Sequence, residues 1–294
     1  MGEKKDILSL LRFPLGKIVR NTAGTAYRHE CTDAAGAMAF EMVFAIFPCL
    51  LVLTALMVIT GTPPEAFNQL IVELGIIIPP PLLAILEENV KHLWGAYQSL
   101  FFFGILGVLG PASASMSTTM SALNRAYNVV EKRSFWKRRM LSLVLVISMG
   151  LSLVIFFNLF VFGEQVVVWM SANWAFLHVM PSLGNILHNL AGFVGTLIVV
   201  ACIYRLAPNI KQHWKDVLPG SFLFLFLWMF IAGGFRFFIQ SFSYYNVLYG
   251  VLGGVIILLL CAYLVAFTLL LGGELNGVLL QHRQRENNGT TGAD

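Results

Sequence analysis

The stretch AMAFEMVFAIFPCLL, residues 37–51, is apolar except for one carboxylate, Glu41. The rest of the chain has the same character: 57% of its 294 residues are hydrophobic and 12% are charged. Soluble domains carry about 25% charged residues. Because so few charges cannot cover a soluble surface of this size, the composition indicates a membrane protein with several spans. Glu41 is then expected to lie in a helix surrounded by lipid or by other helices.

Stretches of about 20 apolar residues predict six transmembrane helices in an all-α polytopic membrane protein. These spans are residues 34–60, 98–123, 140–162, 186–206, 217–240 and 248–275. We expect a cytoplasmic amphipathic segment over 1–33, a six-span membrane domain over 34–276 and a flexible cytoplasmic tail over 277–294. The outer link, about 62–97, is interrupted by Pro79, Pro80 and Pro81, which favours two short interfacial helices over one continuous helix.

The distribution of Lys and Arg predicts how the chain is oriented. Of the 19 basic residues, six precede the first span and six lie in NRAYNVVEKRSFWKRRM, residues 124–140. Three more lie between the fourth and fifth spans, and two follow the last span. By the positive-inside rule both termini are expected to be cytoplasmic, in a bacterial-type inner membrane. The N-terminal segment has no cleavable signal pattern, so the first span is expected to be an uncleaved anchor.

Four stretches resemble one known family in the expected order. They are DAAGAMAFEMVFAIFPCLL (33–51), LNRAYNVVEKRSFWKRRML (123–141), IYRLAPNIKQHWKDVLPGSFLFLFLW (203–228) and YYNVLYGVLGGVIILLLCAYLVAFTLLLGGELN (244–276). Together they are similar to the YihY/virulence factor BrkB family, also called ribonuclease BN-like, over about residues 30 to 280. The resemblance implies an inner-membrane protein with six spans. Serum resistance, transport of lipid-like material and tRNA processing have been attached to the family, and its pattern assigns no role to Glu41.

Catalytic patterns are absent from the sequence. The six histidines form no HxH or HxxxH pair, there is no CxxC among the four cysteines, and no Walker-type loop occurs. A cytoplasmic metal site for a nuclease would have to draw on residues without a recognised ligand spacing, namely His29, Asp33, His213, Asp216, Glu274 and His282. The sequence therefore predicts no enzyme activity, no metal, no cofactor and no ATP-driven step.

Polar groups inside the predicted spans are the main functional candidates, because they are costly in lipid. Glu41 lies about 10 Å from the inner end of the first span. In the second span three serines recur every four residues and so share a helix face. The candidate substrate or coupling residues are Glu41, Ser113, Ser117, Ser121 and Asn124. The small residues of the second span also favour tight packing, and Glu41 is either hydrogen-bonded inside the bundle or faces entering water.

The alternative is that charged residues in or near the spans form buried ion pairs. Glu274 is expected near the inner ends of the second and fourth spans, where Arg125 and Arg205 lie. Arg236 lies about 28 Å from the inner start of the fifth span and is expected near the outer face. An ion pair of Glu274 with Arg125 or Arg205 would join three spans.

Three functions remain open from the sequence alone. The first is a transporter or translocator, not driven by ATP, for an unidentified small molecule or lipid. The second is a non-transporting envelope or scaffold protein, and the third is a membrane-bound ribonuclease. We interpret the basic link as a contact for anionic lipid headgroups, with no nucleic-acid partner.

Overall fold

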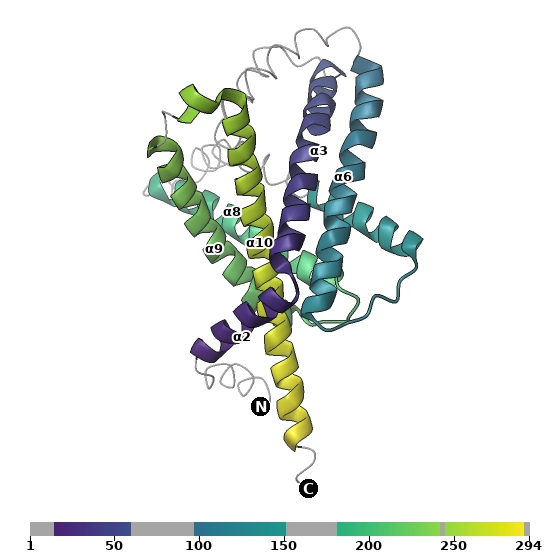
Figure 1. Ribbon diagram of the computed structural model, residues 1–294, viewed down its shortest axis with the longest axis vertical. Coiled ribbons are helices and arrows are strands. Elements are labelled where there is room, and N and C mark those ends of the chain that lie inside the picture. Colours follow the sequence, from purple (N-terminus) through teal and green to yellow (C-terminus); the bar gives the residue numbers. More distant parts are fainter. Residues whose placement is uncertain (1–14, 60–96, 151–180, 242–244, 291–294) are drawn as a thin grey trace. The chain divides into compact units, whose positions relative to one another are not determined.

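The computed structural model describes residues 15–59, 97–150, 181–241 and 245–290. Every regular element in these ranges is a helix, which confirms the predicted all-α class for this part of the chain. A further helical stretch covers 135–150. The helices drawn in Figure 1 are α2 (Leu15–Arg28), α3 (Cys31–Ile59), α6 (Tyr97–Ala126), α8 (Pro181–Leu206), α9 (Trp214–Ser241) and α10 (Tyr245–Thr290).

Two of the described helices are long and apolar enough to cross a membrane, namely Trp214–Gly234 within α9 and Gly253–Arg285 within α10. Gly192–Leu206 within α8 is apolar but shorter. Helices α3 and α6 overlap the first two predicted spans, and the helix at 135–150 overlaps the start of the third. The number six therefore stays a prediction. The proline-rich outer link lies outside the described residues.

The chain divides into two compact units. The first unit takes in Met1–Thr25, Leu123–Phe226 and Leu271–Asp294, and the second takes in Ala26–Ala122 and Leu227–Leu270. Each unit is built from segments that are distant in the sequence. The division into a terminal segment, one membrane domain and a tail stays a prediction.

In the second unit α3 and α6 lie side by side because small residues let them approach closely (Figure 1). A Cβ atom added at Gly104 would come within 2.9 Å of Val52 Cγ2 and 3.3 Å of the Pro48 carbonyl oxygen. Gly107 faces the Pro48 ring in the same way. Pro48 lies inside α3, where it removes one backbone donor. Glycines opposite a proline ring thus set this helix contact.

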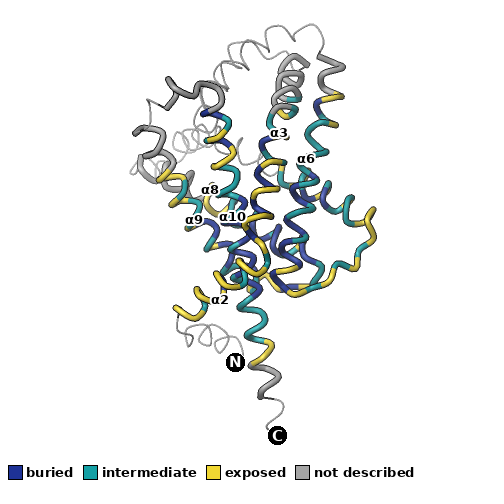
Figure 2. Tube along the Cα trace, viewed as in Figure 1, coloured by how far each residue is buried: buried dark blue, intermediate teal, exposed yellow. Residues whose placement is uncertain are grey.

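In the first unit α9 and α10 meet backbone to backbone. A Cβ atom at Gly220 would overlap the Gly272 carbonyl oxygen, and one at Gly272 would overlap the Tyr204 hydroxyl of α8. Asn276 joins the two helices, because its Oδ1 accepts the Gly220 N–H at 2.6 Å and its Nδ2 donates to the Val217 carbonyl at 3.1 Å. The buried part of α10 lies in its middle, and its C-terminal part is less buried (Figure 2).

Helix α6 ends in a Schellman motif. Asn128 adopts a left-handed conformation with φ of 52°, its N–H donates to the Arg125 carbonyl, and the Val129 N–H donates to the Asn124 carbonyl. Asparagine is one of the few residues other than glycine that tolerates this conformation. The chain thereby leaves the helix in a fixed direction.

Helix α10 continues well past the predicted end of the sixth span. Residues 277–290 are helical, whereas the sequence predicted a flexible tail from 277. Two side chains explain the extension. Gln281 donates to the Ala126 carbonyl at 3.4 Å, and Arg283 forms an ion pair with Asp216.

Gly220→Ala should destabilise the protein strongly, because the added methyl group would overlap the backbone of α10. We expect the free energy of unfolding to fall by about 1–3 kcal/mol, the usual range for overpacking, or by more. A larger loss would arise because a backbone atom cannot move aside as a side chain can. Thermal unfolding of the detergent-solubilised protein measures the change.

Gly233→Ala is the matched control, because it lies in the same helix with nothing within 4 Å of an added Cβ. Removing a mid-helix glycine should leave the stability unchanged or raise it by up to about 1 kcal/mol. Equal unfolding temperatures for the two variants would contradict the close contact of α9 with α10.

Candidate functional site

Glu41 lies on α3 in the second unit and is half-buried. The hydroxyl of Thr118, on α6, donates to Glu41 Oε2 at 3.4 Å. The same hydroxyl lies 3.2 Å from the Ala114 carbonyl oxygen of its own helix. The apolar run that opened the sequence analysis thus carries its carboxylate on a face that meets a polar part of α6.

The hydroxyl row predicted on α6 is engaged mainly within its own helix. Ser113 is fully buried and donates to the Gly110 carbonyl at 2.9 Å. Ser121 donates to the Ser117 carbonyl at 3.0 Å. Such back-bonding satisfies a hydroxyl inside an apolar helix without a ligand. Thr118, which the serine spacing did not single out, donates to the Glu41 carboxylate.

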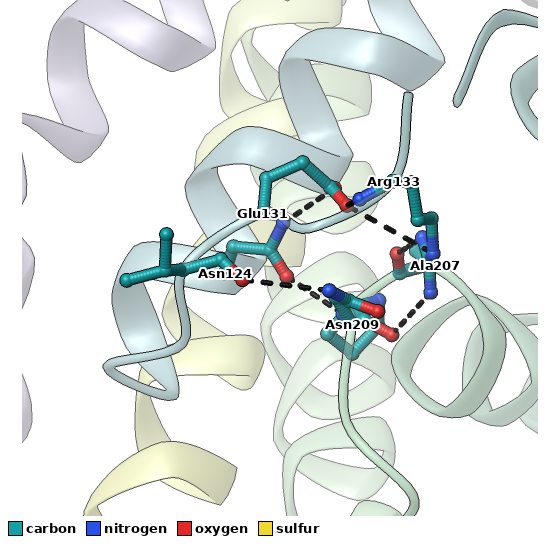
Figure 3. Close-up of polar contacts among 7 residues, drawn as sticks. Asn124, Glu131, Arg133, Ala207 and Asn209 are labelled. Carbon is teal, nitrogen blue, oxygen red and sulfur yellow. Dashed lines mark hydrogen bonds and ion pairs between the residues drawn. The ribbon is translucent and has the colours of Figure 1, made fainter. Parts of the chain in front are cut away.

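Asn124 has a different setting, in the first unit, where it connects two loops (Figure 3). Its Nδ2 donates to Glu131 Oε2 at 2.9 Å, and its Oδ1 accepts the Asn209 N–H at 2.7 Å. Arg133 completes the network by donating to the carbonyls of Ala207 and Pro208, both at 2.9 Å. The contacts of Asn124 described here are therefore those of a residue that positions loops.

A buried polar cluster lies in the same unit. Gln212 and Tyr127 are at least nine-tenths buried, and Asn276 and Glu274 are almost completely buried. The Tyr127 hydroxyl lies beside the amides of Gln212 and Asn276 and near the carboxylates of Asp216 and Glu274. Burial, and to a lesser extent the two carboxylates, raises the pKa of Tyr127, so its phenol stays protonated.

The basic side chains named for the candidate ion pairs lie in varied settings. The Arg205 guanidinium lies 4.2 Å from the centre of the Trp214 ring, a cation–π contact. Arg125 is exposed at the end of α6. Arg236 belongs to α9, but its side chain lies outside the described residues. The ion pair of Glu274 therefore stays a prediction.

Several residues of these networks were not among the predicted site residues. Glu131, Arg133, Asp216 and Arg283 lie in polar loops or helix ends, where charges are usual, so composition did not distinguish them. For Glu131, Arg133 and Asp216 the available signal was their place within the motifs that carry the family resemblance, whereas Arg283 lies beyond the last motif. Within the described ranges, no group of three or more His, Cys, Asp or Glu side chains is placed to bind a metal ion.

These apolar helices and buried polar helix contacts are those of an all-helical integral membrane protein. The family model for virulence factor BrkB matches residues 22–293, so the chain belongs to the virulence factor BrkB family. The motifs quoted above from residues 33 to 276 all fall within the match.

Curated relatives carry two kinds of name. The ribonuclease-like protein YfkH of Bacillus subtilis is 30% identical over 266 residues, which is 88% of this chain and 92% of that protein. A UPF0761 membrane protein of Nitrosospira multiformis is 27% identical, over 88% of this chain and 60% of its own length. Another from Pseudoalteromonas translucida is 23% identical, over 93% and 92% of the two chains. No solved structure matches.

Arg133→Ala should destabilise the protein, because it leaves the carbonyls of Ala207 and Pro208 and the Glu131 carboxylate without the guanidinium. Losing hydrogen bonds from a charged donor costs about 1.5–3 kcal/mol. Thermal unfolding in detergent measures the loss.

Lys132→Ala is the neighbouring control, since Lys132 is exposed and a surface substitution of this kind changes stability by less than about 0.5 kcal/mol. If both variants unfolded at the wild-type temperature, the Arg133 contacts would not contribute to stability.

Proposed function

We propose that this integral membrane protein is a transporter or translocator, not driven by ATP, of a small molecule or lipid. One observation carries the proposal: a half-buried carboxylate, Glu41, lies within a helix that overlaps a predicted span and meets the Thr118 hydroxyl of the next helix. A carboxylate is expensive at membrane depth and is retained mainly where it has a role.

The chemistry of this contact fits a coupling role. A hydroxyl can donate a hydrogen bond to an ionised carboxylate and accept one from a protonated carboxyl group, so the Thr118 contact is compatible with both protonation states of Glu41. Because Glu41 is half-buried, part of its surface is also open to a ligand. Binding or release of a single proton at such a group is a common way to drive a secondary transporter.

A non-transporting scaffold is the alternative, and it has an observation in its favour. The hydroxyls of Ser113 and Ser121 are bonded to their own helix, and Gly104 and Gly107 face the bulk of Pro48. Both features are those of close helix packing. We place transport first because close packing does not require a carboxylate at Glu41, which is costly to bury in a membrane.

We further propose that the chain lies in a bacterial-type inner membrane as a six-span protein with both termini in the cytoplasm. The support is the accumulation of Lys and Arg in alternate links. This topology would place Glu41 nearer to the cytoplasmic side of the first span.

Glu41→Gln should abolish coupled transport in proteoliposomes. The amide keeps the size of the side chain and can still accept from Thr118, but it can neither bind a proton nor attract a cation. Uptake of candidate ions and lipid analogues is measured under an imposed proton or sodium gradient.

Asp33→Asn is the matched control, because Asp33 is an exposed carboxylate in the first turn of the same helix. It should leave the transport rate near the wild-type value. If wild type transports a candidate and Glu41→Gln transports it equally well, Glu41 has no coupling role. If wild type transports none of the candidates, the scaffold alternative is favoured.

We also propose that the chain is not an enzyme, although one relative has a ribonuclease-like name. Purified protein should not cleave RNA, with or without Mg²⁺ or Mn²⁺, beyond the background of a mock purification. Cleavage by wild type that is lost in Asp33→Asn, His213→Ala or Glu274→Gln would overturn this proposal and identify the residues of a nuclease site.

A further inference from the structure

The segment from Val130 to Met140, in the first unit, exposes large apolar side chains. Val130, Phe135 and Trp136 are each about three-quarters exposed, and Met140 is 59% exposed. The rings of Phe135 and Trp136 contact each other edge to face, with their centroids 5.8 Å apart. Exposing so much apolar surface to water in one short segment is unfavourable, so we expect the segment to contact lipid or a partner.

This segment is held in place from behind. The Schellman motif at Asn128 sets its direction, and Asn124 holds Glu131. Arg133 anchors it to the carbonyls of Ala207 and Pro208. The exposed side chains are therefore presented by a backbone with several fixed points, which lowers the entropic cost of binding.

The acidic residue of the segment and its two lysines differ in their surroundings. Glu131, its only acidic residue, is hydrogen-bonded to Asn124 and to the Arg133 backbone and lies 3.9 Å from the Arg133 guanidinium. Lys132 and Lys137 are exposed. The acidic group is thus neutralised by internal partners, while the two lysines remain to attract anions.

The apolar surface continues along the helix at 135–150. Trp136, Met140, Val144 and Ile147 follow one another at spacings of four, four and three residues, and each is more than half exposed. That spacing places them on one face, over a length of about 16 Å. Three of these four side chains are not aromatic and so offer no stacking surface to a nucleobase, whereas the acyl chains of a lipid can cover the whole face.

We propose that residues 130–140 form a binding site for an anionic phospholipid, in which Lys132 and Lys137 bind the headgroup phosphate and Trp136 lies at the boundary between headgroups and acyl chains. Aromatic side chains favour that boundary, and each lysine near it adds attraction to anionic lipid. The site is independent of Glu41 and of the transport proposal.

The test uses full-length protein in detergent and native mass spectrometry, with phosphatidylglycerol and phosphatidylcholine as probes. Wild type should retain phosphatidylglycerol in preference, and high salt should weaken that preference. The double variant Lys132→Gln/Lys137→Gln should bind phosphatidylglycerol about thirty-fold more weakly and phosphatidylcholine unchanged, because each lysine contributes about five-fold.

Two further variants separate charge from position. Lys211→Gln removes an exposed lysine from another loop of the same unit and should leave phosphatidylglycerol binding within about twofold. Trp136→Ala should weaken retention of both lipids. Thermal unfolding should be unchanged in all of these variants, since the substituted side chains are exposed.

Unchanged phosphatidylglycerol binding by the double variant would overturn the proposal. A fluorescent oligoribonucleotide provides the second arm of the experiment. If wild type bound it and the double variant lost that binding while keeping phosphatidylglycerol, the segment would be a nucleic-acid surface, and the lipid site would again be refuted.

Discussion

The first unit depends on the backbone contact of α9 with α10. Two helices can approach this closely only where neither carries a side chain, and Gly220 and Gly272 provide that gap. Close approach exposes backbone atoms to each other, and Asn276 uses both ends of its amide to bond them. A buried amide that is hydrogen-bonded through both its oxygen and its nitrogen fixes the register and the rotation of the two helices. Apolar contacts alone would allow the helices to slide or rotate against each other.

The loops of the first unit follow the same rule. The Asn124 amide joins the Glu131 carboxylate, in the loop that follows α6, to the backbone N–H of Asn209. Arg133 donates to the two carbonyls that follow α8. Backbone groups at helix ends lack partners within their helix and must be satisfied from outside. Here side chains from a neighbouring loop satisfy them, so a small number of Asn and Arg residues determine how the helix ends are connected.

Composition and hydrophobic runs were sufficient to predict helices over the described residues, because a chain this apolar has few other ways to satisfy its backbone in lipid. Positions of helix ends were less predictable. Gln281 and Arg283 continue α10 through residues with the composition of a tail, because their partners, Ala126 and Asp216, come from distant parts of the sequence. Thr118 was missed for a similar reason: a period along one helix does not reveal which hydroxyl faces a neighbouring carboxylate.

The described carboxylates of the chain have different neighbours. Glu131 and Asp216 each face a guanidinium and bond to backbone N–H groups, which is the environment of a structural charge. Glu41, in the second unit, accepts a hydrogen bond from the Thr118 hydroxyl of the neighbouring helix α6. Helices α3 and α6 are thus joined by a polar contact as well as by the close approach of Gly104 and Gly107 to Pro48. The apolar run at residues 37–51 therefore contributes both the proline that Gly104 and Gly107 face and the carboxylate that Thr118 contacts, so one stretch of sequence carries the helix packing and the residue on which the transport proposal rests.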